Sequence, residues 1–254
     1  MNDRVQTVTG HPLTHYDFDT TSVNLNDVTI LPPFDSGKIV GVGLNFKDHI
    51  LELERKGIPS TPPSEPVIFF KAPGSVIAAG EPIVLPPESS RVEYEAELGF
   101  YVKKTARRVP REEADDYIFG YTCVNDVTAR DLQRSDVQWT RAKSFDTFCP
   151  AGPFVESGFD WPAAEIIGML NDAVVQRGRA SDMLFDPPSL LSFISHCFTL
   201  NPGDLVAIGT PAGVGPLKSG DRFTVKIPGI GELTNPVQVE NGANPSTWQK
   251  KGRD

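Results

Sequence analysis

The chain has 254 residues, 39% of them hydrophobic and 22% charged, so it is long enough to bury a sizeable core. A formal net charge of −9 argues against a surface that coats nucleic acid. The N-terminus lacks the basic and apolar segments of a signal peptide, and no apolar stretch approaches the ~20 residues that span a bilayer. The three cysteines show neither CxxC pairing nor zinc-ligand spacing. We therefore expect a cytoplasmic protein with reduced thiols and no membrane or nucleic-acid partner.

The first third of the chain alternates turns with short strand-like segments. Residues 1–36 are turn-rich and are expected to form a small N-terminal lobe or a linker. A predicted strand at Lys38–Leu44 leads into a helix, with Asn45 as its N-cap and Gly57 as its stop. Further strands are predicted at Val67–Lys71, Ile83–Leu85 and Val92–Val102.

The rest of the chain continues this pattern with two helix signals. A short helix is predicted within Pro110–Gly120, because proline and acidic residues stand at its start, and a strand follows at Tyr121–Asp126. Asp186–Cys197 is typical of an amphipathic helix opened by prolines. The segment LVAIG is strand-like, and RFTVKIPGIGELTNPVQVE predicts β-hairpins.

These elements predict an α+β fold that is predominantly β, with a few covering helices. The 23 prolines and 22 glycines favour short strands and turns over a helical bundle. We expect residues 37–242 to form the main domain. The polar residues 243–254 are expected to be a loose C-terminal tail.

Acidic residues alternate with apolar ones in EYEAEL. In a strand, Glu93, Glu95 and Glu97 would stand on one face, where three like charges repel unless a cation lies beside them. A solvated strand face is the simple interpretation of such a pattern. A site for Mg²⁺ or Mn²⁺ is the alternative, with Asp126 at the end of an apolar strand as a further carboxylate.

A histidine and two lysines are further candidates. His49 and Glu52 are three residues apart on the predicted helix and share a face, where the carboxylate would raise the basicity of the imidazole. Lys71 and Lys143 stand beside apolar segments, where each could reach solvent or offer a cation to an anionic substrate. The loop GTPAGVG lacks the GK[ST] of a phosphate loop, although its amides and the Thr210 hydroxyl could hold a small anion.

Six motifs, in this order, resemble the fumarylacetoacetate hydrolase family. They are GLNFKDH, PVIFFKAP, the ExE of YEAELG, GYTCVNDVTARDLQ, TRAKSFDTFCP and GDLVAIGTPAGVGPLKSGD, and they extend over most of the chain. The resemblance implies a mixed β-roll or barrel around the site, a divalent cation in each subunit, and a homodimer.

The resemblance also implies residue roles. Glu95, Glu97 and Asp126 match the metal ligands, which leaves Glu93 outside the metal site. His49 and Glu52 match a catalytic pair, and Lys143 matches a lysine that faces the substrate. Thr210 matches a threonine that binds the substrate carboxylate. Lys71 and Gln133 match residues of the pocket wall.

The expected substrate is a 2-oxo acid that chelates the metal through its carboxylate and keto oxygens. We expect first a hydrolase that cleaves a C–C bond of acylpyruvates, with His49 activating water, and oxaloacetate decarboxylation as a second activity. The alternative is a 2-hydroxyhepta-2,4-diene-1,7-dioate isomerase, or the related 5-carboxymethyl-2-oxo-hex-3-ene-1,7-dioate decarboxylase, of aromatic catabolism. A binding protein without catalysis is disfavoured, because the complete set of site residues is present. The loop at residues 54–64 is a candidate lid.

Overall fold

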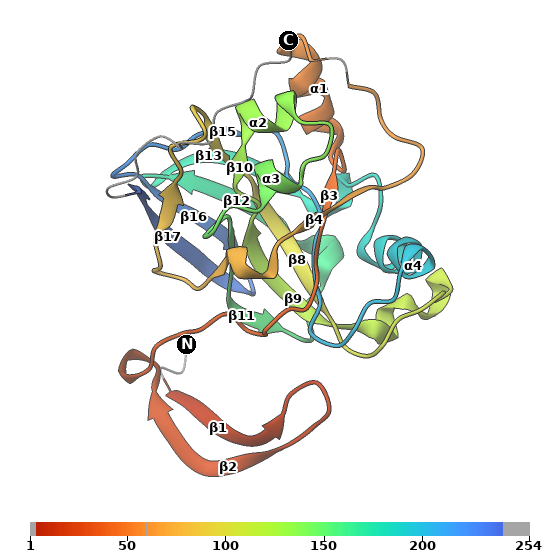
Figure 1. Cartoon of the computed structure of the whole chain (residues 1–254). Helices are drawn as coiled ribbons and strands as arrows, with labels where there is room; N and C mark the ends of the chain where they lie inside the picture. The colour runs from red at the N-terminus through yellow and green to blue at the C-terminus, as the bar shows by residue number, and fades with distance from the viewer. Residues whose placement is uncertain (1–3, 59, 241–254) are drawn as a thin grey trace, which may run out of the picture.

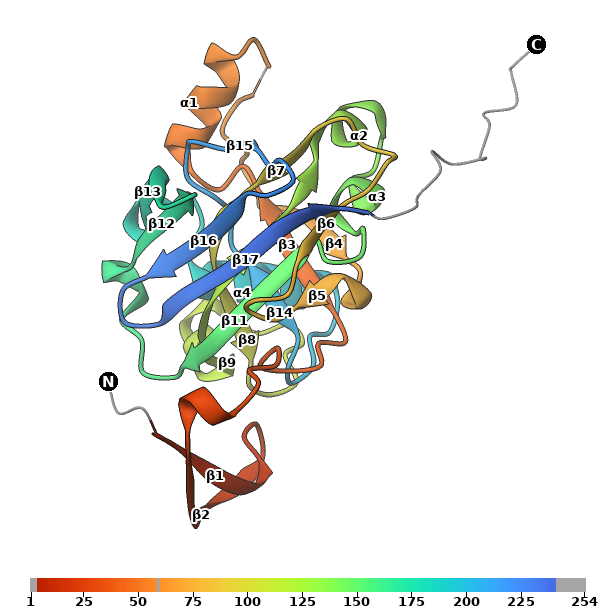
Figure 2. The ribbon, with the colours of Figure 1, turned by 90° about the vertical axis from the view of Figure 1, so that its left-hand side faces the viewer.

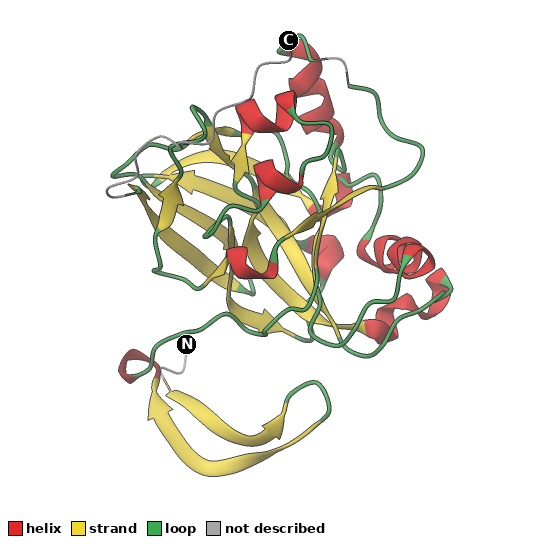
Figure 3. Ribbon diagram, in the orientation of Figure 1, coloured by secondary structure: helices red, strands yellow, loops and turns green. Residues whose placement is uncertain are grey.

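The structure, a computed structural model, describes residues 4–58 and 60–240. Strands dominate this part of the chain and the helices lie outside them, which confirms the predicted, predominantly β fold (Figure 3). The predicted loose tail at residues 243–254 lies outside the described residues, as does the end of the predicted main domain.

Two mixed sheets form the body of the molecule (Figure 1). The larger one has the strand order β4-β3-β14-β8-β9-β11-β5. Its strands, in chain order, are β3 (Ile39–Gly43), β4 (Val67–Lys71), β5 (Val76–Ile77), β8 (Ala96–Val102), β9 (Ile118–Asn125), β11 (Cys149–Glu156) and β14 (Leu205–Ala207). The strands predicted near residues 38–44, 67–71 and 121–126 are therefore confirmed, with small shifts at their ends.

The second sheet has the order β13-β12-β16-β17-β6 and contains the predicted hairpin. Its strands are β6 (Ile83–Leu85), β12 (Glu165–Leu170), β13 (Ala173–Arg179), β16 (Arg222–Ile227) and β17 (Gly231–Val239). Strands β8 and β9 of the larger sheet contact β12, β16 and β17. Buried side chains such as Leu98, Phe100, Phe223 and Val225 form one apolar core there. This packing keeps β8 and β9, which bring residues to the site, rigid.

The strand predicted over Val92–Val102 is divided in the structure. Its first part, β7 (Val92–Tyr94), joins β10 (Thr128–Ala129) and β15 (Gly215–Pro216) in a third, small sheet, and its second part is β8. The division falls at Glu95, whose amide donates to the side-chain oxygen of Asn125 at 3.0 Å instead of to a backbone carbonyl of a neighbouring strand. The chain therefore turns from one sheet to another at the middle carboxylate of the three.

Four α-helices cover the sheets in the described residues: α1 (Lys47–Arg55), α2 (Arg130–Ser135), α3 (Thr140–Lys143) and α4 (Pro187–Cys197). The predicted helix α4 is confirmed, with Asp186 accepting a hydrogen bond from the Ser189 amide at 2.8 Å as its N-cap. Single 3₁₀ segments occur at Leu25–Asp27, Pro73–Ser75, Arg111–Tyr117, Trp161–Ala163 and Ala180–Asp182.

Helix α1 ends at Gly57 as predicted, but its predicted N-cap is wrong. Gly57 has a φ of +74°, the left-handed conformation that ends helices. Asn45 stands one residue too early, and Phe46 occupies the cap position without a side-chain hydrogen bond. The buried Asn45 side chain instead bonds backbone groups of Phe185 and Ile208, so it ties the start of α1 to two distant loops.

The N-terminal segment, which we expected to be a small turn-rich lobe or a linker, contains a β-hairpin. Strands β1 (Arg4–His11) and β2 (His15–Asn24) pair with each other in an antiparallel two-stranded sheet. Figure 2 shows this hairpin below the body, at the opposite end from α1. Phe18 on β2 has 67% of its surface exposed. The hairpin therefore contributes no residue to the site described next.

Candidate active site

Three carboxylates converge where β7, β8 and β9 meet. Oxygen atoms of Glu95, Glu97 and Asp126 all lie within 4.8 Å of one another, and the three residues are buried. They come together because Glu95 directly precedes β8 and Glu97 is the second residue of β8, while Asp126 directly follows β9, the antiparallel neighbour of β8. Glu93 lies on β7, outside this cluster.

Three cations neutralise most of this charge. Arg130, the first residue of α2, bridges Glu93 and Glu95, and the bond from its Nε to Glu93 Oε2 is 2.7 Å long. Lys143 at the end of α3 bonds Glu95 Oε2 at 2.8 Å and also bonds Asp126. Lys71 at the end of β4 bonds Asp126 from the other side, at 2.5 Å. These lysine and arginine side chains therefore supply part of the positive charge that the neighbouring glutamates and aspartate need.

Glu97 is the carboxylate that these cations leave out. It accepts a hydrogen bond from the Gly209 amide at 2.8 Å, and no cation of the described residues pairs with it. Burial raises the pKa of Glu97 well above its usual range, and the charges of Asp126 and Glu95 raise it further. Burial opposes the ionisation of Glu95 as well, but Lys143 and Arg130 hold the pKa of Glu95 well below its usual range.

The cluster fits a divalent cation. Mg²⁺ and Mn²⁺ take carboxylate oxygens as ligands, and three such groups are gathered here. The unpaired Glu97 marks the place where positive charge is missing. A cation there would let all three carboxylates ionise together.

A histidine and a glutamate form a pair on α1. His49 Nδ1 lies 3.3 Å from Glu52 Oε2. Burial opposes the ionisation of Glu52, but hydrogen bonds from His49, Lys56 and the Gly213 amide lower the pKa of Glu52 to about 2. Since an ionised carboxylate only accepts hydrogen bonds, Nδ1 of His49 must be the donor, and Nε2 of the neutral ring is left free to accept a proton.

The loop at residues 209–213 connects this pair to the carboxylates. The Gly209 amide donates to Glu97, and the Gly213 amide donates to Glu52 at 3.0 Å. The Ala212 amide donates to Asp48 at 3.2 Å. These amides were expected to hold a small anion, and in the structure they hold side-chain carboxylates of the chain itself.

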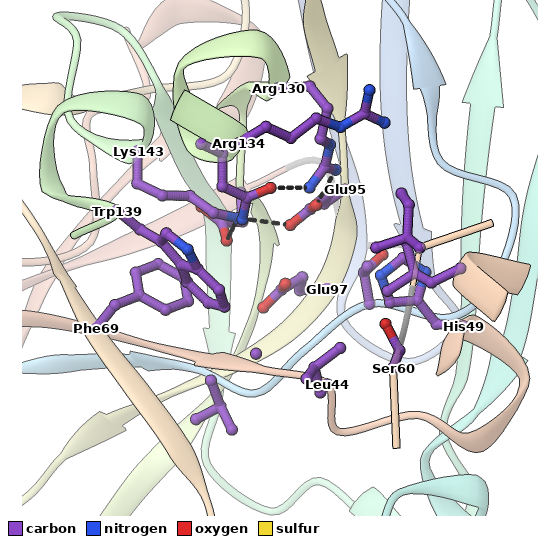
Figure 4. A pocket seen from close by; sticks show the side chains of 17 residues that line it. Leu44, His49, Ser60, Phe69, Glu95, Glu97, Arg130, Arg134, Trp139 and Lys143 are labelled. Atoms are coloured by element: carbon purple, nitrogen blue, oxygen red, sulfur yellow. Dashed lines mark hydrogen bonds and ion pairs between the residues drawn. The ribbon is translucent and has the colours of Figure 1, made fainter. Parts of the chain in front are cut away.

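The three carboxylates and His49 line one cavity of about 270 Å³ (Figure 4). In the close-up, Lys143 and Trp139 lie on one side of Glu97 and His49 on the other. The volume suits a small organic acid with a few waters. Leu53, Ile58 and Ser60 also line the cavity, so the segment predicted as a lid borders it, while its movement remains a prediction.

The structure brings together most of the predicted site residues. The cavity lining includes the predicted His49, Glu95, Glu97, Asp126, Gln133, Lys143 and Thr210. Glu52 contacts His49 and is not part of the lining. Lys71, assigned to the pocket wall from the family resemblance, is instead buried behind Asp126 and does not line the cavity.

The hydroxyl of Thr210 is already engaged. It donates to the Ala96 carbonyl at 2.9 Å and accepts a hydrogen bond from the Gln176 side chain at 2.8 Å. Its proton is therefore not free for a substrate in this structure. Gln133, in contrast, accepts a bond from Arg130 through its carbonyl, and its amide nitrogen has no partner among the described residues.

The sequence-based reasoning missed Arg130, the residue that separates Glu93 from the other carboxylates. A signal was present, because Arg130 follows Asp126 by four residues in NDVTARDLQ, just beyond the strand predicted at Tyr121–Asp126. Arg134 and Trp139 of the cavity wall were missed as well. They join the carboxylates at the cavity wall only in space, and no spacing rule points to them.

A β-rich fold with a carboxylate cluster and a histidine–glutamate pair around one small cavity is typical of an enzyme for small molecules. None of the helices between residues 4 and 240, residue 59 aside, is long and apolar enough to cross a membrane.

Comparison with known proteins identifies the family. Residues 38–238 match the family described as Fumarylacetoacetate (FAA) hydrolase C-terminal, and the chain belongs to this family. It is 48% identical over 86% of its length to an uncharacterized protein of Archaeoglobus fulgidus, covering 85% of that protein. It is 38% identical to the oxaloacetate tautomerase YisK of Bacillus subtilis, over 81% of this chain and 71% of that protein.

Two solved structures are informative about this fold. The 2-hydroxyhepta-2,4-diene-1,7-dioate isomerase of Mycobacterium marinum has 40% identity and a TM-score of 0.86, with 94% of this chain and 88% of that chain covered. The maleylpyruvate hydrolase of Sphingobium sp. SYK-6, solved with manganese(II) and pyruvate, has 30% identity and a TM-score of 0.73. That match covers 86% of this chain and 77% of the hydrolase. Family members thus include a tautomerase, an isomerase and a hydrolase.

Proposed function

We propose that the protein is a divalent-metal-dependent enzyme that moves a proton on the carbon next to the keto group of a 2-oxo acid. Oxaloacetate is the substrate that we propose first, interconverted between its keto and enol forms. The observation that carries the proposal is that His49 and the three carboxylates line the same cavity of about 270 Å³. A proton acceptor and a place for a chelated 2-oxo acid therefore face one another.

His49 is the proposed base. Nε2 takes a proton from C3 of the keto acid, and the electron pair of the broken C–H bond forms the C2–C3 double bond while the C2 oxygen becomes negative. Glu52, held ionised by its three hydrogen-bond donors, stabilises the imidazolium that results. The proton then passes to the C2 oxygen and yields the enol, so no atom is gained or lost.

The negative oxygen requires positive charge beside it. Glu95, Glu97 and Asp126 would hold Mg²⁺ or Mn²⁺, which supplies Lewis-acid stabilisation of that oxygen when it is bound. Lys143 adds a fixed positive charge at the cavity wall. Burial opposes its protonation, but Asp126 and Glu95 raise the pKa of Lys143 above its usual range. The Phe69 ring centroid lies 4.8 Å from the Lys143 ammonium.

Cleavage of acylpyruvates, which we expected first from the sequence, is the second candidate. The maleylpyruvate hydrolase with 30% identity supports it, whereas the tautomerase and the isomerase, at 38% and 40%, support proton transfer. In a hydrolase the same Nε2 would take its proton from water instead of carbon. The oxaloacetate decarboxylation of the sequence-based expectation would use the same oxygen stabilisation without a base. A homodimer also remains our proposal, from the family resemblance, and sedimentation would measure the oligomeric state. A cytoplasmic location remains our proposal from the cysteine pattern.

An NMR experiment separates these activities. Keto–enol exchange of oxaloacetate and cleavage of acetylpyruvate are followed with Mg²⁺, each beside an EDTA control. We expect faster keto–enol exchange that EDTA abolishes and that His49→Asn reduces by at least ~100-fold, the range of general base catalysis. His196→Asn is the matched control, because His196 is an exposed residue of α4 outside the cavity.

Each outcome decides between the candidates. Acetate and pyruvate formed from acetylpyruvate, with oxaloacetate exchange unchanged, would replace the tautomerase by the hydrolase. Pyruvate formed from oxaloacetate faster than the enol would favour decarboxylation. No effect on any 2-oxo acid would overturn the proposed function.

A further inference from the structure

Arg134 is a cation of the cavity wall that the proposed chemistry does not use. Three cationic residues line the cavity, and two of them are engaged: Lys143 with Glu95 and Asp126, and Arg130 with Glu93 and Glu95. Arg134 makes no hydrogen bond or ion pair with any residue of the described part of the chain. Arg134 is exposed and lines the cavity, so its guanidinium is accessible to a ligand that enters the cavity.

The helix fixes where this charge lies. Arg134 follows Arg130 by four residues on α2, so the two residues share a face and stand about one turn, ~6 Å, apart along the helix axis. Arg130 reaches to Glu95 at the carboxylate cluster, whereas the Arg134 guanidinium points away from the cluster (Figure 4). The cavity therefore has a negative inner end and a free positive group farther out.

This polarity matches a ligand with two different ends. The inner end suits the chelating carboxylate and keto oxygen of a 2-oxo acid, as proposed above. We infer that Arg134 binds a second carboxylate at the far end of the substrate, so that the enzyme selects 2-oxo dicarboxylates over 2-oxo monocarboxylates. A guanidinium suits this role because its planar N–H groups match both oxygens of a carboxylate. The inference rests on the proposed function for the position of the inner end.

Two ligands that differ in the distal carboxylate test the proposed contact with Arg134. Oxaloacetate and oxalate both carry two negative charges, but oxalate ends at the chelating group. With Mg²⁺ present, KM for oxaloacetate and the inhibition constant of oxalate are measured for the wild type and for Arg134→Gln. We expect KM for oxaloacetate to rise about 10- to 100-fold, the range for a lost charge-assisted hydrogen bond, and the oxalate constant to change less than about 2-fold.

Two further variants separate the shape of the Arg134 guanidinium from its charge and from a general change in surface charge. Arg134→Lys keeps the charge but lacks the planar guanidinium group. Its KM for oxaloacetate should lie between the values of the wild type and Arg134→Gln. Arg55→Gln makes the same change of charge on an exposed residue of α1 that does not line the cavity, and it should alter neither constant.

The inference is overturned if Arg134→Gln leaves KM for oxaloacetate within about 2-fold, or if it weakens oxalate equally. Failure of the proposed function appears differently, as wild-type protein that turns over no oxaloacetate. In that case dissociation constants from calorimetry replace KM, and the ratio of oxaloacetate to oxalate binding still tests Arg134.

Discussion

Replacing Glu97 by glutamine should leave the metal-free protein as stable as the wild type, or more stable, while abolishing its response to metal. Glu97 is a buried carboxylate with one hydrogen bond from a backbone amide and no cation beside it among the described residues. At 4.8 Å, the largest separation of their oxygen atoms, and an effective dielectric constant of about 20, each of its two carboxylate neighbours would repel an ionised Glu97 by about 3.5 kcal/mol or more. Lys71, Lys143 and Arg130 offset most of that repulsion, so the net gain from glutamine should be about 0–3 kcal/mol.

In the presence of metal, the wild type should become more stable than Glu97→Gln. At a free Mg²⁺ or Mn²⁺ concentration about 100 times Kd, binding stabilises the native state by about 2.7 kcal/mol. For a chain of this length that corresponds to a rise in Tm of roughly 5–10 °C. The wild type should show this rise and Glu97→Gln should not. Differential scanning calorimetry with EDTA and with each metal measures both quantities.

Glu93→Gln is the matched control for this experiment. Glu93 is buried like Glu97, but it bonds both Arg91 and Arg130 and lies outside the carboxylate cluster. Arg130 and Arg91 lower its pKa although burial opposes this, so Glu93→Gln should destabilise the protein and keep the metal response. An equal metal-induced rise in Tm for the wild type and Glu97→Gln would refute the assignment of Glu97 as a ligand. A loss of more than about 2 kcal/mol in metal-free Glu97→Gln would refute the electrostatic reasoning.

Three further substitutions test other parts of the site. Because the folded-state pKa of Glu52 is depressed from 4.5 to about 2, its stabilisation is present above pH 4.5 and is lost as the pH falls towards 2. Urea unfolding should therefore show Glu52→Gln to be about 1–2 kcal/mol less stable at pH 7, with a difference that shrinks on acidification; a constant difference would contradict this. Lys71→Met should cost about 3–5 kcal/mol in chemical denaturation, since it removes a fully buried partner of Asp126, and an unchanged midpoint would show that the ion pair is unimportant. Gly213→Ala should reduce both stability and activity, because φ is +106° and a Cβ would lie 2.2 Å from the Val175 carbonyl oxygen; wild-type values of Tm and kcat would count against this.

The sequence predicted the site better than it predicted the path of the chain. The carboxylates, His49 and Lys143 could be placed because the motifs that contain them are short and their family resemblance is specific. The division of the strand at Glu95 could not be predicted, since it depends on a hydrogen bond from Glu95 to Asn125, 30 residues away in the sequence. The alternation of polar and apolar residues indicates which face of a strand a residue occupies. It does not indicate where the chain leaves one sheet and joins another.

The same limit explains the errors at Lys71 and Asn45. Both are polar residues that stand next to apolar segments, where the sequence suggests a pocket wall for one and a helix cap for the other. In the structure both are buried and bonded to groups more than 50 residues away: Lys71 to Asp126, and Asn45 to Phe185 and Ile208. The N-terminal hairpin escaped prediction because its strands carry polar residues on both faces and bury little.

The loop at residues 209–213 fixes the distance between two parts of the candidate site. One end of this five-residue segment fixes Glu97 and the other end fixes Glu52, in both cases through backbone amides. The spacing between the proposed base and the carboxylate cluster therefore depends on the number of peptide units in this segment, together with a backbone conformation at Gly213 that favours glycine. Inserting or deleting a single residue here would move the proposed base relative to the carboxylate cluster even if every named side chain were kept.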